Sequence, residues 1–243
     1  MTAIVLAGGK GARLKSLTQS LPKPLLPLGD VSILEVIVRQ LTSAGATRIV
    51  VSLGHSSSCF DRLIQDARGS GLPVEAVIES EPLGTAGPIR LVPDLVDSHF
   101  LVVNGDVLTT IDFKRVFEVH AASAAAGTIC TTTVSTSLDY GVITTDANGR
   151  VQRYSEKPVV VHQVSMGINV LSQVSLGFIP EGAPSNMPDL MNSMNEAGLP
   201  IFSYQADCYW NDIGRDQDYD RAASDFISNP AMFLGKCAQN NSR

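Results

Sequence analysis

The chain has 243 residues, of which 44% are hydrophobic and 17% charged, and its formal net charge is −6. This is an ordinary globular composition, with enough residues for one large domain or two small ones. A net negative charge argues against sequence-independent binding to nucleic acid, which depends on clustered Lys and Arg. We therefore expect small molecules or other proteins as partners, and no nucleic acid.

The cysteines and the N-terminus indicate the compartment. The four cysteines are far apart, without a CxxC pair or a local His cluster, so neither a disulfide framework nor a zinc site is predicted. A reducing, cytoplasmic location is expected. The apolar run at residues 3–9 is too short for a secretory leader or a membrane span and predicts a buried strand, so no membrane partner is expected.

The first half of the chain alternates two kinds of segment. Short runs rich in Val, Ile and Leu predict buried strands at residues 3–9, 48–54, 74–79 and 99–106. Helical patterns lie between them at residues 32–45, 56–71 and 84–96. The first of these opens with Ser32 and Glu35, a capping-box spacing. Such alternation predicts βαβ units and a mostly parallel sheet.

The second half predicts strands that are close together in the sequence, at residues 127–136, 140–158 and 164–171. The tetrapeptide DANG at 146–149 is a strong hairpin-turn signal. A helix at 187–198, a strand at 200–210 and a helix at 215–228 follow, and the remaining residues carry little signal. Without a repeat, a linker or a composition shift, we expect a single domain over residues 1–243.

A glycine-rich loop, LAGGKGARL at residues 6–14, follows the first predicted strand. Arg13 stands near the place of the last glycine of a dinucleotide fingerprint, and no correctly spaced Lys-Ser or Lys-Thr pair completes a Walker motif. What remains is a strand end whose backbone N–H groups could receive oxyanions, with Arg13 as a cation. A flexible turn without function remains an alternative on these residues alone.

A second cationic element lies at LPKPLLPLG, residues 21–29. Pro22 and Pro24 flank Lys23, which predicts an extended, non-helical backbone there. A lysine constrained in this way could serve as a fixed point charge.

Taken together, these elements resemble the sugar-nucleotide pyrophosphorylases, which join a nucleoside triphosphate to a sugar 1-phosphate. The family motifs occur in order and at about the family's spacing, over residues 3 to about 220. The matching segments are GGKGARL with PKP, EPLGTAGPI (81–89), VVNGDV (102–107), YGV (140–142), EKP (156–158) and WNDIG (210–214). The GDP-mannose pyrophosphorylase and heptose 1-phosphate guanylyltransferase branches are the most similar.

The resemblance implies an α/β, Rossmann-like three-layer nucleotidyltransferase fold with a mixed, mostly parallel central sheet. Nucleotide would bind over about residues 1–110 and sugar phosphate over about 111–230. It also implies Mg²⁺ as cofactor and in-line attack on the α-phosphorus, with pyrophosphate leaving. Many relatives carry a C-terminal β-helix that we do not expect here, and many are dimers or tetramers, so a homodimer is one expected assembly.

The resemblance also implies roles for individual residues. The catalytic cations would be Arg13, Lys23 and Lys157, and the metal ligands Asp106 and Asp212, although a carboxylate at a strand end also fits an ordinary turn. The nucleotide-binding residues would be Leu6, Ala7, Gly8, Gly9, Gly11, Glu79, Gly84 and Thr85. The sugar-phosphate-binding residues would be Asn104, Tyr140, Gly141, Glu156, Lys157 and Gly167.

The position of Glu79 bears on the base. Thymidylyl and uridylyl branches commonly have Gln there, whereas an ionised Glu only accepts hydrogen bonds and so complements the two adjacent donors of guanine. GTP is therefore the expected substrate, with UTP, dTTP or CTP as alternatives. A carboxylate that simply points into water is the competing interpretation of Glu79.

One segment departs from the family pattern. Where Asn-Ala-Gly and an aromatic residue are usual, this chain has Ser165, Met166, Gly167, Ile168 and Asn169. This departure leaves the acceptor open: a hexose, a heptose, a deoxy or amino sugar, or a cyclitol phosphate. A non-catalytic subunit that binds nucleotide sugars is a second hypothesis. A glycosyltransferase is a weaker one, because residues 104–106 read Asn-Gly-Asp and not Asp-x-Asp.

Overall fold

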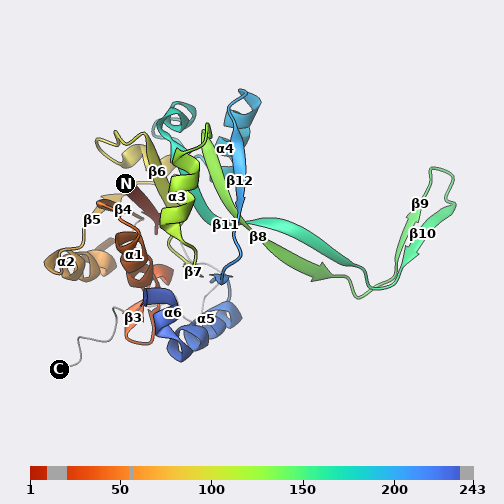
Figure 1. The fold of residues 1–243 in the computed structure, drawn as a ribbon, viewed down its shortest axis with the longest axis horizontal. Coiled ribbons are helices and arrows are strands. Elements are labelled where there is room, and N and C mark those ends of the chain that lie inside the picture. The colour runs from red at the N-terminus through yellow and green to blue at the C-terminus, as the bar shows by residue number, and fades with distance from the viewer. Residues whose placement is uncertain (10–20, 55–56, 236–243) are drawn as a thin grey trace.

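The computed structural model describes residues 1–9, 21–54 and 57–235. Within these residues a seven-stranded sheet forms the middle layer of the molecule (Figure 1). The strands are β1 (Thr2–Leu6), β2 (Pro27–Leu28), β3 (Val31–Ser32), β4 (Arg48–Leu53), β5 (Val74–Ile78), β6 (His99–Asn104), β7 (Val107–Thr109), β8 (Gly127–Ser137), β9 (Val142–Thr145), β10 (Val151–Ser155), β11 (Val159–Ser172), β12 (Ile201–Gln205) and β13 (Trp210–Asp212). The α-helices are α1 (Ile33–Ser43), α2 (Asp61–Gly69), α3 (Phe113–Ala121), α4 (Met187–Glu196), α5 (Asp216–Ser228) and α6 (Pro230–Leu234). Four 3₁₀ helices complete the described elements: η1 (Lys23–Leu25), η2 (Ser57–Phe60), η3 (Gly87–Leu91) and η4 (Gln173–Phe178).

The large sheet has the strand order β12-β8-β11-β6-β1-β4-β5. Its neighbouring strands are parallel except for β11, which runs antiparallel to both β8 and β6. The α/β class with a mixed, mostly parallel sheet is thus confirmed. None of the helices among the described residues is long and apolar enough to cross a membrane.

Alternating side chains of the buried strands fill two cores, one on each face of the sheet. In β1, Ala3 and Val5 point to the core that α1, α2 and α5 cover, whereas Ile4 points to the core beneath η3 and α4. This alternation with period two explains why the predicted strands are apolar on both faces. Three layers result, as expected.

Most predicted elements of the first half are found near their predicted positions. The helix expected at 32–45 is α1, and Ser32 caps it by accepting a hydrogen bond from the Glu35 N–H at 3.2 Å. In the second half, the helix expected at 215–228 is α5. No element was predicted after it, but residues 230–234 form the short helix α6.

The helix predicted at 84–96 is wrong, since only the 3₁₀ helix η3 forms there. Gly84 has a φ of +78°, outside the helical region, and the N–H groups of Ala86 and Gly87 donate to the carbonyl of Ser185 instead of joining a helix. Tertiary hydrogen bonds therefore replace the local ones that the pattern implied.

The extended backbone predicted around Lys23 is also wrong. Residues Lys23–Leu25 form η1, closed by hydrogen bonds from Leu25 N–H to Pro22 O at 2.9 Å and from Leu26 N–H to Lys23 O at 3.1 Å. A 3₁₀ turn accommodates Pro24 near its start because no N–H is required there.

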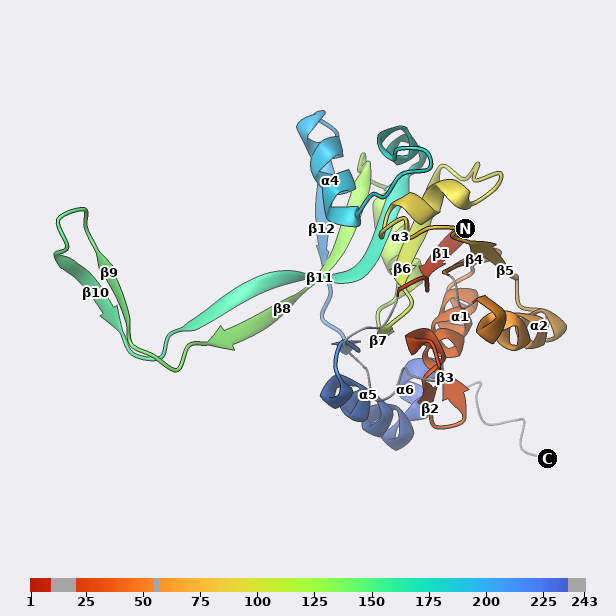
Figure 2. The ribbon, with the colours of Figure 1, turned by 180° about the vertical axis from the view of Figure 1, so that it is seen from behind.

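A long hairpin leaves the body of the protein, and we call its residues 132–165 the arm. Both views show the distal parts of β8 and β11 and the smaller sheet β9–β10 projecting away from the rest of the chain (Figures 1 and 2). The DANG turn at the tip is confirmed, with Gly149 at φ +81° and its N–H donating to Asp146 O. A register shift between Ser165 and Asn169 marks the base of the arm.

His120, on α3, is fully buried and held neutral. Its Nδ1 lies 2.8 Å from Thr128 Oγ1, and its Nε2 lies 3.1 Å from Ser172 Oγ, which donates to Ala125 O. Burial, and secondarily the nearby His99, lower the pKa of His120 from 6.5 to about 4. The unfolded chain therefore binds an extra proton between these two values.

The protein should lose stability as the pH falls through this window, because protonation favours the unfolded chain. At pH 5 the loss from His120 should be about 2 kcal/mol relative to neutral pH. Urea denaturation from pH 7.5 to 5 gives the free energy of unfolding of the wild type and of His120→Gln. The wild-type value should fall more steeply with falling pH than the value of the variant. Parallel stability curves for the two proteins would contradict the assignment.

Candidate active site

The carboxyl ends of the parallel strands β1, β4, β5 and β6 meet at one edge of the sheet. β1 lies between β4 and β6, so that Leu6 is paired with Ser52 on one side and Asn104 on the other. The residues that follow these strands, including Gly8, Glu79 and Asp106, are consequently brought to the same edge. This is the edge at which ligands bind in open α/β sheets.

Glu79 is buried at this edge, with 6% of its surface exposed. Ser52 Oγ donates to one carboxylate oxygen at 2.9 Å, and the N–H of Leu83 donates to the other at 3.1 Å. The backbone of Gly8 lies against the carboxylate so closely that a Cβ at Gly8 would overlap it. The interpretation of Glu79 as a carboxylate that simply points into water is therefore wrong.

The sequence reasoning missed Ser52. It is fully buried and holds Glu79 by a hydrogen bond, and the signal was available, because it is the one polar residue in the interior of the apolar run at 48–54. A lone polar side chain near the end of a buried strand indicates that a polar partner is adjacent.

Lys23 and Asp106 form the second polar centre. Lys23 Nζ donates to Asp106 Oδ2 at 2.6 Å, and the two side chains are 12% and 30% exposed. The turn η1 thus places a cation directly on the carboxylate that ends the β6 segment. Two residues that are 83 positions apart in the sequence share one site, as the resemblance implies.

Asp212 approaches this centre on β13. That strand pairs antiparallel with β7, with Asp212 opposite Val107, and the N–H of Ile213 donates to Asp106 O at 3.1 Å. Trp210, on the same strand, donates its indole N–H to Met166 O at 3.0 Å and so fixes β13 against β11. Trp210 is a second positioning residue that the sequence reasoning missed.

The donor set at Asp106 and Asp212 fits a magnesium ion that binds together with a triphosphate. Within the described residues no group of three or more His, Cys, Asp or Glu could hold a metal. Mg²⁺, however, is commonly bound by one or two carboxylates plus phosphate oxygens and water. Two carboxylates on paired segments beside a lysine satisfy that requirement.

Asn104 and Gly167 are in contact at the base of the arm. Gly167 has a φ of +71°, and a Cβ there would come within 2.5 Å of Asn104 Nδ2. The glycine therefore permits both the left-handed backbone at the register shift and the close approach of Asn104. These two predicted sugar-binding residues lie next to the Asp106 segment.

Gly84 and Thr85 contact the segment that leads into α4. A Cβ at Gly84 would come within 2.5 Å of Ser185 O, and Thr85 Oγ1 accepts a hydrogen bond from Met187 N–H at 2.7 Å, at the start of α4. The structure explains both residues by this packing, and their role toward a base stays a prediction.

Four of the predicted sugar-phosphate residues lie away from the strand ends. Tyr140, Gly141, Glu156 and Lys157 lie on the arm, and all four are exposed. Gly141 is in close contact with the ring of Tyr154, since a Cβ would come within 2.5 Å of it. Their predicted contact with the sugar phosphate therefore stays a prediction.

The glycine-rich loop is described only up to Gly9. Leu6 and Ala7 end β1 and begin the loop, and Ala7 N–H donates to Ser52 O at 2.8 Å. Gly11 and Arg13 lie outside the described residues, so their predicted roles stay predictions.

The comparisons with known proteins agree with this geometry. A model of the family described as "Nucleotidyl transferase" matches residues 2–229. The chain belongs to that family. The resemblance inferred from the sequence motifs is thus confirmed.

Curated members of the nucleotidyl transferase family extend beyond the length of this chain. The chain is 29% identical to a UTP--glucose-1-phosphate uridylyltransferase from Synechocystis, over 94% of this chain and 64% of that protein. It is 32% identical to a mannose-1-phosphate guanyltransferase from Aspergillus oryzae, over 100% of this chain and 67% of that protein. The chain thus spans about two thirds of the length of these relatives.

Among solved structures, HddC from Yersinia pseudotuberculosis has nearly the same extent. It is 27% identical, covers 93% of this chain and 99% of its own, and superposes with a TM-score of 0.70. A second HddC structure, complexed with GMP-PN, gives a TM-score of 0.69 at 25% identity over 93% of this chain and 99% of that one.

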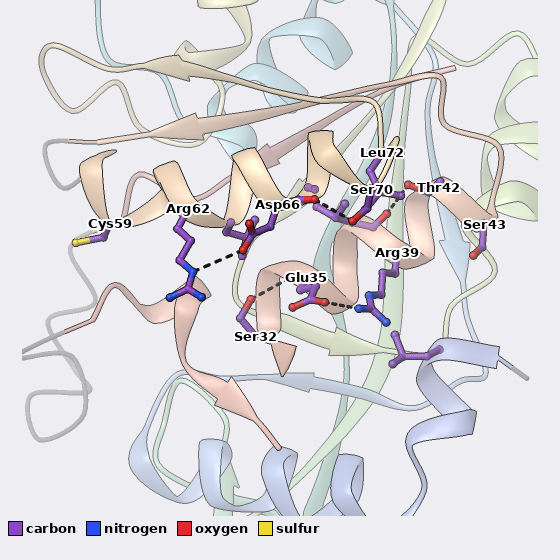
Figure 3. Close-up of a pocket in the computed structure, with 14 residues that line it drawn as sticks. Ser32, Glu35, Arg39, Thr42, Ser43, Cys59, Arg62, Asp66, Ser70 and Leu72 are labelled. Atoms are coloured by element: carbon purple, nitrogen blue, oxygen red, sulfur yellow. Dashed lines mark hydrogen bonds and ion pairs between the residues drawn. The ribbon is translucent and has the colours of Figure 1, made fainter. Parts of the chain in front are cut away.

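An open groove of about 650 Å³ lies elsewhere, between α1 and α2 (Figure 3). Ion pairs within each helix, Glu35 with Arg39 and Arg62 with Asp66, satisfy its charged side chains. None of the motif residues lines this groove. The strand ends therefore remain the candidate active site of this nucleotidyl transferase.

The contact between Gly8 and Glu79 can be tested with neighbouring glycines. Gly8→Ala should lower the free energy of unfolding by about 1–3 kcal/mol, because its methyl group would displace the buried carboxylate. Gly9→Ala is the matched control, since a Cβ there has no described atom within 4 Å. Urea denaturation gives both values.

A double-mutant cycle identifies the partner. In a Glu79→Ala background the cost of Gly8→Ala should fall by at least half, because the overlapping carboxylate is gone. An unchanged cost would mean that another atom opposes the methyl group.

Proposed function

We propose that this nucleotidyl transferase condenses a nucleoside triphosphate with a sugar 1-phosphate or a sugar-like cyclitol 1-phosphate. A phosphate oxygen of the acceptor forms a bond to the α-phosphorus. The bond from the α-phosphorus to the bridging oxygen breaks, and its electron pair leaves with pyrophosphate. The observation that carries this proposal is the Lys23–Asp106 pair at the strand ends, beside Asp212 and Asn104.

The reaction requires positioning and charge neutralisation more than a covalent nucleophile. Lys23 is held by Asp106 and is mostly buried, so its ammonium group is oriented before any substrate arrives. On binding, the lysine would turn from the carboxylate to the phosphates and neutralise charge on the leaving pyrophosphate. Asp106 and Asp212 would then hold Mg²⁺, which supplies further charge neutralisation on the phosphate oxygens.

We further propose that the base is guanine. The carboxylate of Glu79 is an acceptor beside the Gly8 backbone, and adjacent N1–H and N2–H donors of guanine complement it. The HddC complex with GMP-PN and the relative named as a guanyltransferase support guanine. The relative named as a uridylyltransferase makes UTP the triphosphate against which GTP should be compared. A cytoplasmic location also stays a prediction.

The reaction and its metal site are tested by measuring pyrophosphate release. The wild type should release pyrophosphate with GTP, Mg²⁺ and at least one member of a panel of sugar and cyclitol 1-phosphates. Asp106→Asn should lower kcat/KM by about 100-fold or more, because it removes both a metal ligand and the partner of Lys23.

Asp66→Asn is the matched control, because this exposed carboxylate lies in the groove between α1 and α2 and should leave activity unchanged. A wild type that binds a GDP-sugar but releases no pyrophosphate with any triphosphate would instead indicate a non-catalytic subunit. Full activity of Asp106→Asn would refute the metal assignment.

The base assignment is tested by Glu79→Gln. The glutamine keeps an acceptor for Ser52 and adds an amide donor that suits the carbonyl groups of uracil and thymine. We expect the ratio of kcat/KM for GTP over UTP to fall about 10-fold or more. A ratio that does not change would show that Glu79 does not contact the base.

A further inference from the structure

The arm has contacts with β12 only at its base, where Gln205 donates to Thr133 and Gln163 donates to Ser203, and its outer part has no partner among the described residues. Beyond Thr131, the last β8 residue paired with β12, the strand β8 pairs only with β11, and β11 joins β6 only from Ile168 onward. Beyond these contacts, no described element covers the faces or the edges of the arm (Figures 1 and 2). Isolated two-stranded hairpins are at best marginally stable in water, and open edges promote association.

Apolar side chains line the arm although it has no core. Those that are more than half exposed are Tyr140, Ile143, Val151, Tyr154, Val159 and Val161. Apolar surface of this extent on a projecting element is typical of an interface that is covered in the assembled protein.

The arm also carries motif residues that are not found among the described residues of its own active site. Lys157 precedes Ile168 by 11 residues, which at about 3.3 Å per residue gives a reach of about 35 Å along the strand. Glu156 and Lys157 are thus held far from Lys23 and Asp106, and both are exposed. Yet they belong to the motif that resembles the sugar-phosphate contact of the family.

Resting on the proposed function, we propose that two copies of this chain exchange arms, so that Glu156 and Lys157 of one copy complete the sugar-phosphate site of the other. Exchange of an identical element is a low-cost route to a dimer, and two-fold symmetry makes the exchange reciprocal. Each active site then combines Lys23, Asp106 and Asp212 of one chain with the arm of its partner.

A second copy is the occupant that the structure favours. Among its described residues the body presents two carboxylates and one lysine at the site but not the lysine of the EKP motif, and the arm presents that lysine. Lys157 also has a φ of +42°, which is uncommon for a residue other than glycine and occurs preferentially at functional sites. The strand-end site and the arm that would complete it are thus parts of the same chain, so a second copy can supply either of them.

Heterodimers with one defect in each copy test the exchange. Asp106→Asn and Lys157→Asn copies, carrying different tags, are co-expressed, and dimers with both tags are purified. Asparagine is chosen at position 157 because it tolerates a positive φ. With exchanged arms, the Lys157→Asn body receives an intact Lys157 from its partner, so one of the two sites is complete.

The heterodimer should therefore have about half of the wild-type kcat, while each homodimer should lose about 100-fold or more. If each chain used its own arm, both sites would be defective and the heterodimer would be as weak as its parents, which would overturn the proposal. A heterodimer of Asp106→Asn with Lys23→Ala is the matched control. Both of its defects are in the bodies, so no activity should return.

The mass in solution tests the exchange without any activity. The wild type should have twice the chain mass of 25.8 kDa. A variant in which Asn-Gly replaces residues 138–158 should be monomeric and keep a cooperative unfolding transition. A monomeric wild type, or a dimer that persists without these residues, would refute the exchange even if pyrophosphate release is normal. A dimer that depends on the arm but releases no pyrophosphate would refute only the catalytic function.

Discussion

The parallel pairing of β1 with β4 and β6 is the constraint on which the site depends. Because Leu6 is in register with both Ser52 and Asn104, the three strands end together. Every polar residue that follows them is delivered to one edge of the sheet. The contact between Ser52 and Glu79 depends in the same way on the pairing of β4 with β5, where a shift of one residue would turn one strand's side chains to the opposite face and separate the two residues.

Two carboxylates at this edge are held in different ways. Glu79 is buried and is bound by neutral donors in the part of the chain that the structure describes, so it is directed at whatever donors a ligand brings. Asp106 is partly exposed and already has a cationic partner in Lys23. Glu79 is therefore suited to accept hydrogen bonds from a neutral ligand. Asp106, beside Lys23, is suited to a site where charged groups meet.

Much of this arrangement could be predicted from the sequence, because apolar runs at strand length dominate the first half. Residues 48–54 and 99–106 gave strands with nearly correct ends. The segment 84–96 failed because its N–H groups bond to Ser185, a residue that no local pattern connects with it. The arm could not be foreseen either, since the DANG turn predicts a hairpin but says nothing of whether the hairpin folds back onto the body.

The antiparallel strand β11 has a consequence for how the chain is made. It inserts between β8 and β6, although it is synthesised after both of them. Until it emerges from the ribosome, β6 presents an unpaired edge, and about 68 residues separate the end of β6 from the end of β11. At typical synthesis rates of about 5–20 residues per second, this edge stays open for several seconds. The open edge of β6 can therefore pair with other strands during translation, until β11 covers it.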